Sequence, residues 1–385
     1  MSASAYTTVK WTLLLLIAGL AILPAVQKAF RPFYPGKLDG YSEPVPLPSF
    51  STATVFDGTF PLAITRRFDR GTGFHNGLVR LHNQIDFSLF RVPHAKNVII
   101  GKEDYLFEEQ YIKAWSGMDF IGEDIIEARA KQFRFAQDWL MKEKGVLFLV
   151  LLLPDKGSFY PEKIPARYGI APGEKTNYSC YRDRLALYGV NFIDFNAWFL
   201  AMKDTCLYPL YPKCGIHWSG YGSWLAIDSL VRFLGYKTGV DLPHPECEGI
   251  RVDGIPEGRE NDVEKALNLA CPIGSPPMAH PDVAFTEPRS RKTFSALFIG
   301  DSFYFTWAEA GYIGKSFTNR DFWYYDHEVW YGTYNTGKAA EKEDLMKTLD
   351  RMNAVVIMQT NAGYGELGYY FVDRMLEKAG FAGKH

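Results

Sequence analysis

The stretch FIGDSF, residues 298–303, decides the fold. A short apolar run ends abruptly at Gly300, and a helix is expected to begin soon after. In an open α/β sheet, active sites form where the parallel strands end, so Ser302 is the candidate nucleophile. Backbone N–H groups at the following helix start can stabilise an oxyanion, and the Asp301 carboxylate is expected to accept N–H bonds of the turn. An ordinary Ser or Asp helix cap after a strand is the alternative.

Apolar runs and helical patterns alternate along the chain from about residue 95. Val146–Leu153 is an eight-residue apolar run, which is typical of a strand buried on both faces. Further short strands are expected at Lys96–Ile100, Val190–Asp194, Phe294–Ile299, Phe322–Tyr325 and Ala354–Met358. This alternation predicts an α/β fold with a mainly parallel sheet between two layers of helices. Residues 238–292 break the rhythm and are expected to form an insertion.

The N-terminus carries an uncharged, Leu-rich run of 16 residues, Trp11–Val26, with basic residues on both sides. We expect a transmembrane signal anchor over residues 1–30, with a cleaved secretory signal as the alternative. Either one places the remaining chain outside the cytoplasm. An extended arm and a lead-in helix are expected over 31–94, followed by the α/β domain over 95–385.

Composition excludes several classes of protein. The 385 residues include 42 Lys and Arg against 44 Asp and Glu, so the net charge of −2 argues against a nucleic-acid partner. No cysteine or histidine spacing matches a metal site, and neither a metal nor a cofactor is expected. The five cysteines allow two disulfides, 206–214 and 247–271, or free thiols: Cys180, Cys206, Cys214, Cys247 and Cys271.

A second candidate lies in the stretch YPKCGIHWS, residues 211–219, just before an amphipathic helix. A histidine on such a loop can act as a general base, because its ordinary pKa of about 6.5 suits proton exchange near neutral pH. His217 is therefore the candidate base, and an ordinary loop histidine is the alternative.

Together, the His-Trp-Ser loop and the later Gly-Asp-Ser strand end resemble the alginate O-acetyltransferase family, the SGNH-like domains of the AlgJ/AlgX type. In that family an Asp-x-His-Trp loop precedes the Gly-Asp-Ser motif, which reverses the usual SGNH hydrolase order. Residues 101–107, GKEDYLF, and 153–156, LPDK, followed by Tyr160-Pro161, are similar to two other family segments. The resemblance implies a three-layer SGNH-hydrolase-like fold with a circularly permuted motif order.

The resemblance also implies that Ser302 is the nucleophile and His217 its base, with an acyl-enzyme intermediate. One position departs from the family pattern: Gly215 stands where the family has its triad aspartate. A different acid can replace it, first Asp194 at a strand end, or else Asp155. A Ser–His dyad oriented by a backbone carbonyl, or a catalytically weak protein, would also fit this departure.

Within the SGNH plan, Asn361 and Gly332 follow later strands and are expected to contribute oxyanion donors, while Trp218 supports the site. The implied function is a membrane-anchored, extracytoplasmic O-acetyltransferase for hydroxyls of an exopolysaccharide or cell-envelope polysaccharide. A multi-pass membrane O-acyltransferase partner would supply the acetyl group. A carbohydrate acetyl esterase and a polysaccharide-binding scaffold are the two rival functions.

Overall fold

The computed structural model describes residues 3–34, 36–40, 46–71, 73–168, 173–288 and 293–381. The chain forms two compact units. The larger one, called the α/β unit here, comprises Asn97–Val263 and Ile273–His385; the N-terminal unit comprises Met1–Lys96 and Glu264–Pro272.

A seven-stranded sheet organises the α/β unit, in the order β10-β9-β8-β7-β11-β3-β4. The strands from β8 to β4 in this order run parallel, and β9 and β10 add an antiparallel hairpin at one edge. The strands are β3 (Leu147–Leu153), β4 (Phe192–Asp194), β7 (Ala296–Gly300), β8 (Asp321–Tyr324), β9 (Glu328–Tyr331), β10 (Tyr334–Ala339) and β11 (Ala354–Thr360). The predicted α/β fold with a mostly parallel sheet is confirmed.

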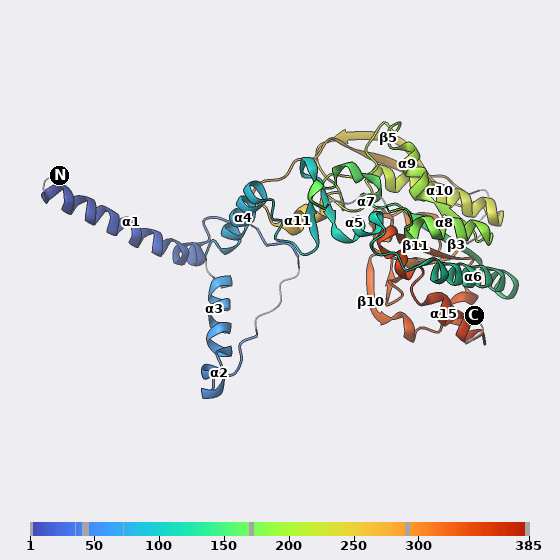
Figure 1. Ribbon diagram of the computed structural model, residues 1–385, viewed down its shortest axis with the longest axis horizontal. Coiled ribbons are helices and arrows are strands. Elements are labelled where there is room, and N and C mark those ends of the chain that lie inside the picture. The colour runs from blue at the N-terminus through green and yellow to red at the C-terminus, as the bar shows by residue number, and fades with distance from the viewer. Residues whose placement is uncertain are drawn as a thin grey trace. The chain divides into compact units, whose positions relative to one another are not determined.

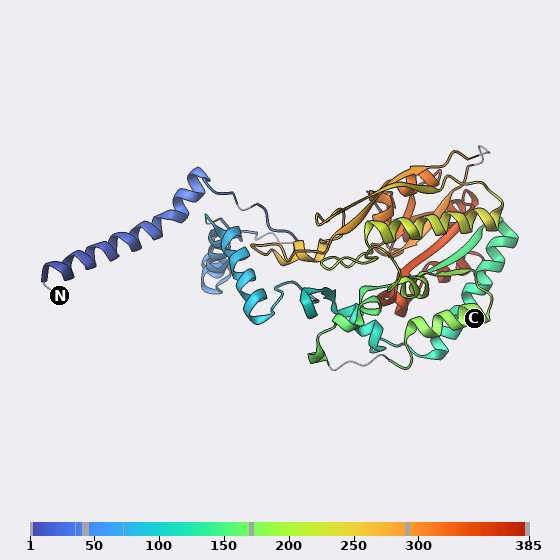
Figure 2. The same cartoon turned by 90° about the horizontal axis from the view of Figure 1, so that it is seen from above.

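Helices cover both faces of this sheet (Figure 2). Successive side chains of β3 point to opposite faces, so Leu149 and Leu151 enter one core while Phe148 and Val150 enter the other. The first core is covered by α9 (Phe195–Met202), α10 (Gly220–Thr238), α12 (Tyr304–Glu309) and α13 (Tyr312–Ser316). The second is covered by α6 (Glu123–Trp139), α8 (Asn177–Leu187), α14 (Leu345–Asp350) and α15 (Phe371–Lys378). The apolar run predicted as a doubly buried strand therefore belongs to the middle layer of a three-layer structure.

Smaller elements complete the α/β unit. The expected insertion contains a two-stranded hairpin of β5 (Pro245–Asp253) and β6 (Met278–Phe285), and α11 (Asp262–Leu267) lies between the two strands in sequence. Other short elements are β1 (Val98–Ile100), β2 (Leu106–Glu108), α5 (Glu109–Ser116) and α7 (Lys156–Phe159). No disulfide joins any of the five cysteines, all of which lie in the described ranges, so neither pairing considered from the sequence is present.

The N-terminal unit begins with a long apolar helix, α1 (Ala3–Phe30), drawn in dark blue in Figure 1. By length and composition, Tyr6–Phe30 is long and apolar enough to cross a membrane. The segment expected as an extended arm instead forms α2 (Thr52–Phe56) and α3 (Thr59–Gly71). A capping box between Ser51 and Thr54 starts the first of these helices. The unit continues with α4 (His75–Ile85) and the π-helical turn Asp86–Phe90.

Candidate active site

Ser302 follows the central strand β7 at the edge of the sheet where the parallel strands end. The strand closes with Gly300, and α12 begins two residues after the serine. A Cβ at Gly300 would lie 2.2 Å from the carbonyl oxygen of Met358 on the neighbouring strand β11. The close approach of β11 therefore requires glycine at this position.

The buried side chain of Asp301 holds the turn that carries Ser302. One carboxylate oxygen accepts the Phe303 N–H at 3.0 Å. The other accepts the N–H of Thr360 at 2.8 Å and its hydroxyl at 2.9 Å. Burial raises the pKa of Asp301, although these hydrogen bonds act in the opposite direction. The bond from Phe303 is a turn bond of the kind that the sequence predicts, whereas the two bonds from Thr360 tie the turn to strand β11.

His217 lies on the loop that leads into α10, and its ring contacts the Ser302 hydroxyl. Its Nε2 lies 2.9 Å from the Ser302 Oγ, and the ring is almost fully buried. The next residue, Trp218, fixes this loop on α12 because its indole N–H donates to the Thr306 hydroxyl at 2.6 Å. The Trp218 ring also stacks on Trp307, with 5.3 Å between ring centroids. The sequence-predicted nucleophile and base thus lie within hydrogen-bond distance, and Trp218 supports them.

The second ring nitrogen of His217 faces a carboxylate that sequence reasoning did not find. Asp262, at the start of α11, places its Oδ2 2.6 Å from the histidine Nδ1. Its Oδ1 accepts the N–H groups of Ile216 at 3.1 Å and Val263 at 2.8 Å. Burial pushes the pKa of Asp262 upward, but the contact with His217 and these hydrogen bonds outweigh it and leave the pKa below its ordinary value. Ser302, His217 and Asp262 therefore form a complete Ser–His–acid arrangement.

The two acids named from the sequence serve elsewhere, which corrects that expectation. Asp194 caps α9 by accepting the Ala197 N–H at 2.8 Å, and its carboxylate also accepts the Tyr178 hydroxyl at 2.9 Å. Asp155 caps α7 by accepting the Ser158 N–H at 2.7 Å. Each of these carboxylates caps the start of a helix, and the carboxylate at the His217 Nδ1 is that of Asp262 instead.

Asp262 belongs to a segment, residues 257–262 and here called the acid segment, that is fastened on both sides of the site. The buried carboxylate of Glu260 accepts the N–H of Gly220, at the start of α10, at 3.0 Å. The Arg259 guanidinium pairs with Glu309 on α12, with a shortest contact of 2.7 Å. The acid segment is thus held to the helix that follows the base and to the helix that follows the nucleophile.

Gly215 makes this arrangement possible. A Cβ there would lie 2.5 Å from the carbonyl oxygen of Arg259 and 2.7 Å from that of Glu260. Its φ is not among the positive values of the chain, so steric room rather than a left-handed conformation requires glycine. The backbone of the acid segment occupies the space that a side chain at position 215 would need. The same segment carries Asp262, whose carboxylate contacts His217.

Asn361 lies at the predicted edge of the sheet. It directly follows β11, the parallel neighbour of β7, and comes after Thr360, which binds Asp301. Its amide nitrogen donates to the Ser158 hydroxyl at 2.6 Å, and its buried carbonyl oxygen has no hydrogen-bond partner among the described residues. The role of Asn361 as an oxyanion donor stays a prediction, and in this structure its amide N–H group is bound to Ser158.

Gly332 does not lie at this edge, and its predicted role is wrong. Strand β9 runs antiparallel to β8, so Tyr331 pairs with Asp321 at the beginning of β8 rather than at its end. Gly332 follows Tyr331 on the side of the sheet where the parallel strands begin, not where they end. Its N–H already donates to the carbonyl of Arg320 at 2.8 Å. The hairpin that reverses the chain direction after β8 could not be read from the apolar pattern.

The fully buried Lys156 binds the backbone of the histidine loop. Its ammonium nitrogen donates to the carbonyl oxygens of Lys213 at 2.5 Å and Gly215 at 2.8 Å. Burial lowers the pKa of Lys156 to about 7. Lys156 thus holds the loop two residues before the candidate base.

Replacing Lys156 by methionine is expected to destabilise the protein by about 1–3 kcal/mol, because the buried Gly215 carbonyl loses its donor and the Lys213 carbonyl keeps only the Leu106 N–H. Between about pH 7 and the ordinary value of 10.5, the unfolded chain binds more protons than the folded one. Stability conferred through this group therefore rises with pH in that window, and Lys156→Met should lack the rise. Urea unfolding at several pH values measures both effects. Lys102→Met, which removes an exposed lysine-to-carbonyl bond, is the matched control, and equal losses in both variants would contradict the prediction.

The family model of the SGNH hydrolase-like domain of the acetyltransferase AlgX matches residues 98–327, more than half of the chain. This chain belongs to that family. The resemblance noted from the short motifs is therefore confirmed, and the α/β unit is an SGNH-like domain of the AlgX type.

Three solved structures that are similar to this AlgX-type chain are distant from it in sequence. The O-acetyltransferase domain of Pseudomonas putida AlgJ is 14% identical, with a TM-score of 0.45 over 70% of this chain and 92% of that one. Pseudomonas aeruginosa AlgX is 14% identical, with a TM-score of 0.42 over 72% and 66% of the two chains. Bacillus cereus PatB1 with a sulfonyl adduct is 12% identical, with a TM-score of 0.43 over 72% and 99%. No curated protein matches this chain at a significant level.

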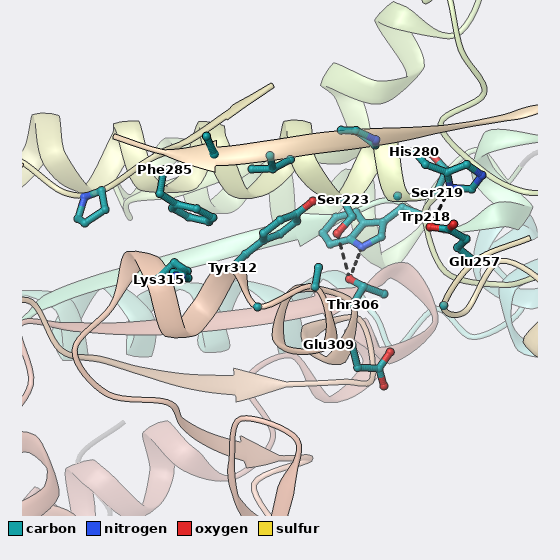
Figure 3. Close-up of a pocket in the computed structure, with 18 of the residues that line it drawn as sticks. Trp218, Ser219, Ser223, Glu257, His280, Phe285, Thr306, Glu309, Tyr312 and Lys315 are labelled. Atoms are coloured by element: carbon teal, nitrogen blue, oxygen red, sulfur yellow. Dashed lines mark hydrogen bonds and ion pairs between the residues drawn. The ribbon is translucent and has the colours of Figure 1, made fainter. Parts of the chain in front are cut away.

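A cavity of about 860 Å³ adjoins the histidine loop of this AlgX-type domain, between strand β6 and helices α10, α12 and α13. Figure 3 shows Trp218 and Ser223 converging on Thr306 in its wall, with Phe285 and Tyr312 along its length. Arg259 and Glu260 of the acid segment also line it. The cavity therefore shares its wall with the residues that hold the catalytic arrangement.

A group of residues with metal-ligand geometry is part of the N-terminal unit. Among the described residues, one set of His, Cys, Asp or Glu side chains could hold a metal ion, with its ligand atoms within 4.8 Å of one another: His82, Asp86 and His94. They belong to the N-terminal unit. Ser302, His217 and Asp262 together offer the groups of serine acyl transfer, for which no metal ligand is needed.

Proposed function

We propose that this protein is a membrane-anchored, extracytoplasmic O-acetyltransferase that modifies hydroxyls of an exopolysaccharide or cell-envelope polysaccharide. The observation that carries the proposal is the arrangement of Ser302, His217 and Asp262, with contacts of 2.9 Å and 2.6 Å at the two ring nitrogens. Membership of the AlgX acetyltransferase family supports the acetyl group as the cargo.

The first half-reaction forms an acetyl-enzyme. The Ser302 Oγ attacks the acetyl carbonyl carbon of the donor while its proton passes to the Nε2 of His217. Asp262 keeps the Nδ1 proton in place and stabilises the imidazolium. The tetrahedral intermediate then collapses, the bond to the donor oxygen breaks, and the Nε2 proton leaves with the donor.

The developing oxyanion needs donors at the strand edge. Among the described residues, the backbone N–H of Ser302 forms no hydrogen bond, and it is our first donor. The Asn361 amide is the second, once it exchanges the Ser158 hydroxyl for the oxyanion. No role falls to Gly332.

The second half-reaction transfers the acetyl group to a sugar. His217 takes the proton of an acceptor hydroxyl, whose oxygen attacks the acetyl carbon, and Ser302 leaves with the proton returned from His217. We place sugar rings of the polymer in the cavity beside Trp218, where the Phe285 and Tyr312 rings offer apolar faces. A multi-pass membrane O-acyltransferase partner delivers the acetyl group, since activated acetyl donors are made in the cytoplasm.

The apolar helix α1 supports the membrane part of the proposal. The 25-residue candidate span Tyr6–Phe30, with its uncharged run of 16 residues, matches the length needed to span a bilayer, and its side chains from Tyr6 to Leu23 are largely exposed. The α/β unit then lies on the extracytoplasmic side.

A trapping experiment tests the proposed function. The purified full chain in detergent is incubated with p-nitrophenyl acetate, quenched in acid and mapped by peptide mass spectrometry. One acetyl group is expected on the peptide that contains Ser302, and none on a heat-denatured control. Adding a polysaccharide fragment should move the acetyl group to the sugar. Release as acetate alone would favour the esterase, and an unmodified Ser302 would favour the scaffold.

A further inference from the structure

The C-terminal end of α3 lies against the end of α1, where the apolar helix leaves its candidate membrane span. A Cβ at Gly73 would lie 2.2 Å from the Pro24 carbonyl oxygen and 2.9 Å from the Lys28 backbone nitrogen. In Figure 1, α3 runs at a steep angle to α1 rather than continuing along it. If α1 crosses a bilayer, the C-terminal end of α3 lies near the bilayer surface, and the steep angle between the two helices directs α3 along that surface.

This part of the N-terminal unit exposes large apolar side chains. Five of them in residues 50–68 are at least 42% exposed, and Phe56 reaches 89%: Phe50, Phe56, Leu62, Ile64 and Phe68. On α3, Phe60, Ile64 and Phe68 recur every four residues and so share one face of the helix. Soluble proteins rarely leave so many adjacent apolar groups in water, so this face is expected to be covered.

Basic side chains accompany the apolar face. Residues 52–71 carry three arginines against two aspartates, and Arg66 and Arg67 are exposed on α3. Lys28 and Arg31 lie at the end of α1, at the same end as the contact with Gly73. An amphipathic helix with apolar and basic sides beside a membrane span matches the interface of an anionic bilayer.

We propose that α2 and α3 lie in the headgroup region of the membrane that α1 crosses. Phe56 and the Ile64 face enter the boundary of the acyl chains, while Arg66 and Arg67 contact lipid phosphates. The inference rests on the membrane anchoring in the proposed function, and it adds a second, peripheral contact with the same bilayer. Its partner is anionic phospholipid.

Hydrogen exchange of the full chain reconstituted into vesicles tests this inference. In phosphatidylcholine vesicles that contain one quarter phosphatidylglycerol, amides of residues 52–71 are expected to exchange about tenfold more slowly than in a Phe56→Glu/Ile64→Glu variant. Arg66→Gln/Arg67→Gln should lose much of that slowing. Leu207→Glu changes an 80% exposed apolar residue of the α/β unit, and it should leave residues 52–71 unaffected.

The remaining outcomes each overturn the inference in a recognisable way. A chain that alkaline carbonate extracts from the vesicles lacks the anchor, which overturns this inference together with the membrane part of the function. A chain that resists extraction but exchanges at the same rate in parent and variants overturns the inference alone. Slowing that appears only in native membranes would assign the apolar face to a protein partner instead. Acetylation of Ser302 by p-nitrophenyl acetate should be equal in the parent and the α2–α3 variants.

Discussion

Asp262→Asn is expected to lower acetyl transfer by about 10⁴-fold, the loss typical of a catalytic histidine deprived of its carboxylate. The Oδ1 position is held by the N–H groups of Ile216 and Val263, so the amide oxygen of the asparagine must occupy it. Its NH₂ group then faces the Nδ1 of His217. That contact places the ring proton on Nε2, which can no longer accept the proton of Ser302.

The rate constant kcat/KM for transfer from p-nitrophenyl acetate to a polysaccharide fragment measures this loss. Thermal unfolding should show that the variant still folds. Asp194→Asn is the matched control, because its side chain can still cap α9 through the Ala197 N–H, and its rate should stay within a few-fold of the parent. A large loss in Asp194→Asn with an active Asp262→Asn would reverse the assignment of the acid.

The sheet and two members of the site were predictable from local sequence. A doubly buried strand is marked by an unbroken apolar run such as Val146–Leu153, and an abrupt Gly-Asp-Ser after another apolar run marks a strand end. Ser302 and Asp301 were placed at the ends of the parallel strands from their position after an apolar run, and Asn361 was placed there through the SGNH plan of the resembling family. His217 was found because its loop precedes a clear amphipathic helix.

The acid was not predictable in the same way, because its place depends on tertiary contacts. Asp262 lies 45 residues beyond His217 in a charged segment with no periodicity, and its sequence neighbours give no catalytic signal. Only the close packing of Arg259 and Glu260 against Gly215 reveals why that segment reaches the histidine. The prediction for Gly332 failed for a related reason, because an antiparallel hairpin and a parallel crossover have similar apolar runs in the sequence.

Gly215→Asp, which restores the aspartate of the resembling family, is expected to lower acetyl transfer by at least about 100-fold rather than raise it. The first atom of the new side chain would collide with the backbone of Arg259 and Glu260 at 2.5–2.7 Å, and backbone cannot yield as the end of a flexible side chain can. Overpacking of this kind costs about 1–3 kcal/mol. It would also push the acid segment outward and carry Asp262 away from the Nδ1 of His217.

Three further variants separate the causes of this loss. Gly215→Ala carries the same Cβ without a charge, so it should lose most of the activity if displacement of the acid segment is responsible. Gly220→Ala is the matched control, because a Cβ there would have no neighbour closer than 3.7 Å, and it should remain active. Parent activity in Gly215→Asp would mean that the acid segment moves freely. A double variant Gly215→Asp/Asp262→Asn that is faster than Asp262→Asn alone would show that the two carboxylate positions are interchangeable, whereas the contacts of Arg259 and Glu260 argue that one excludes the other.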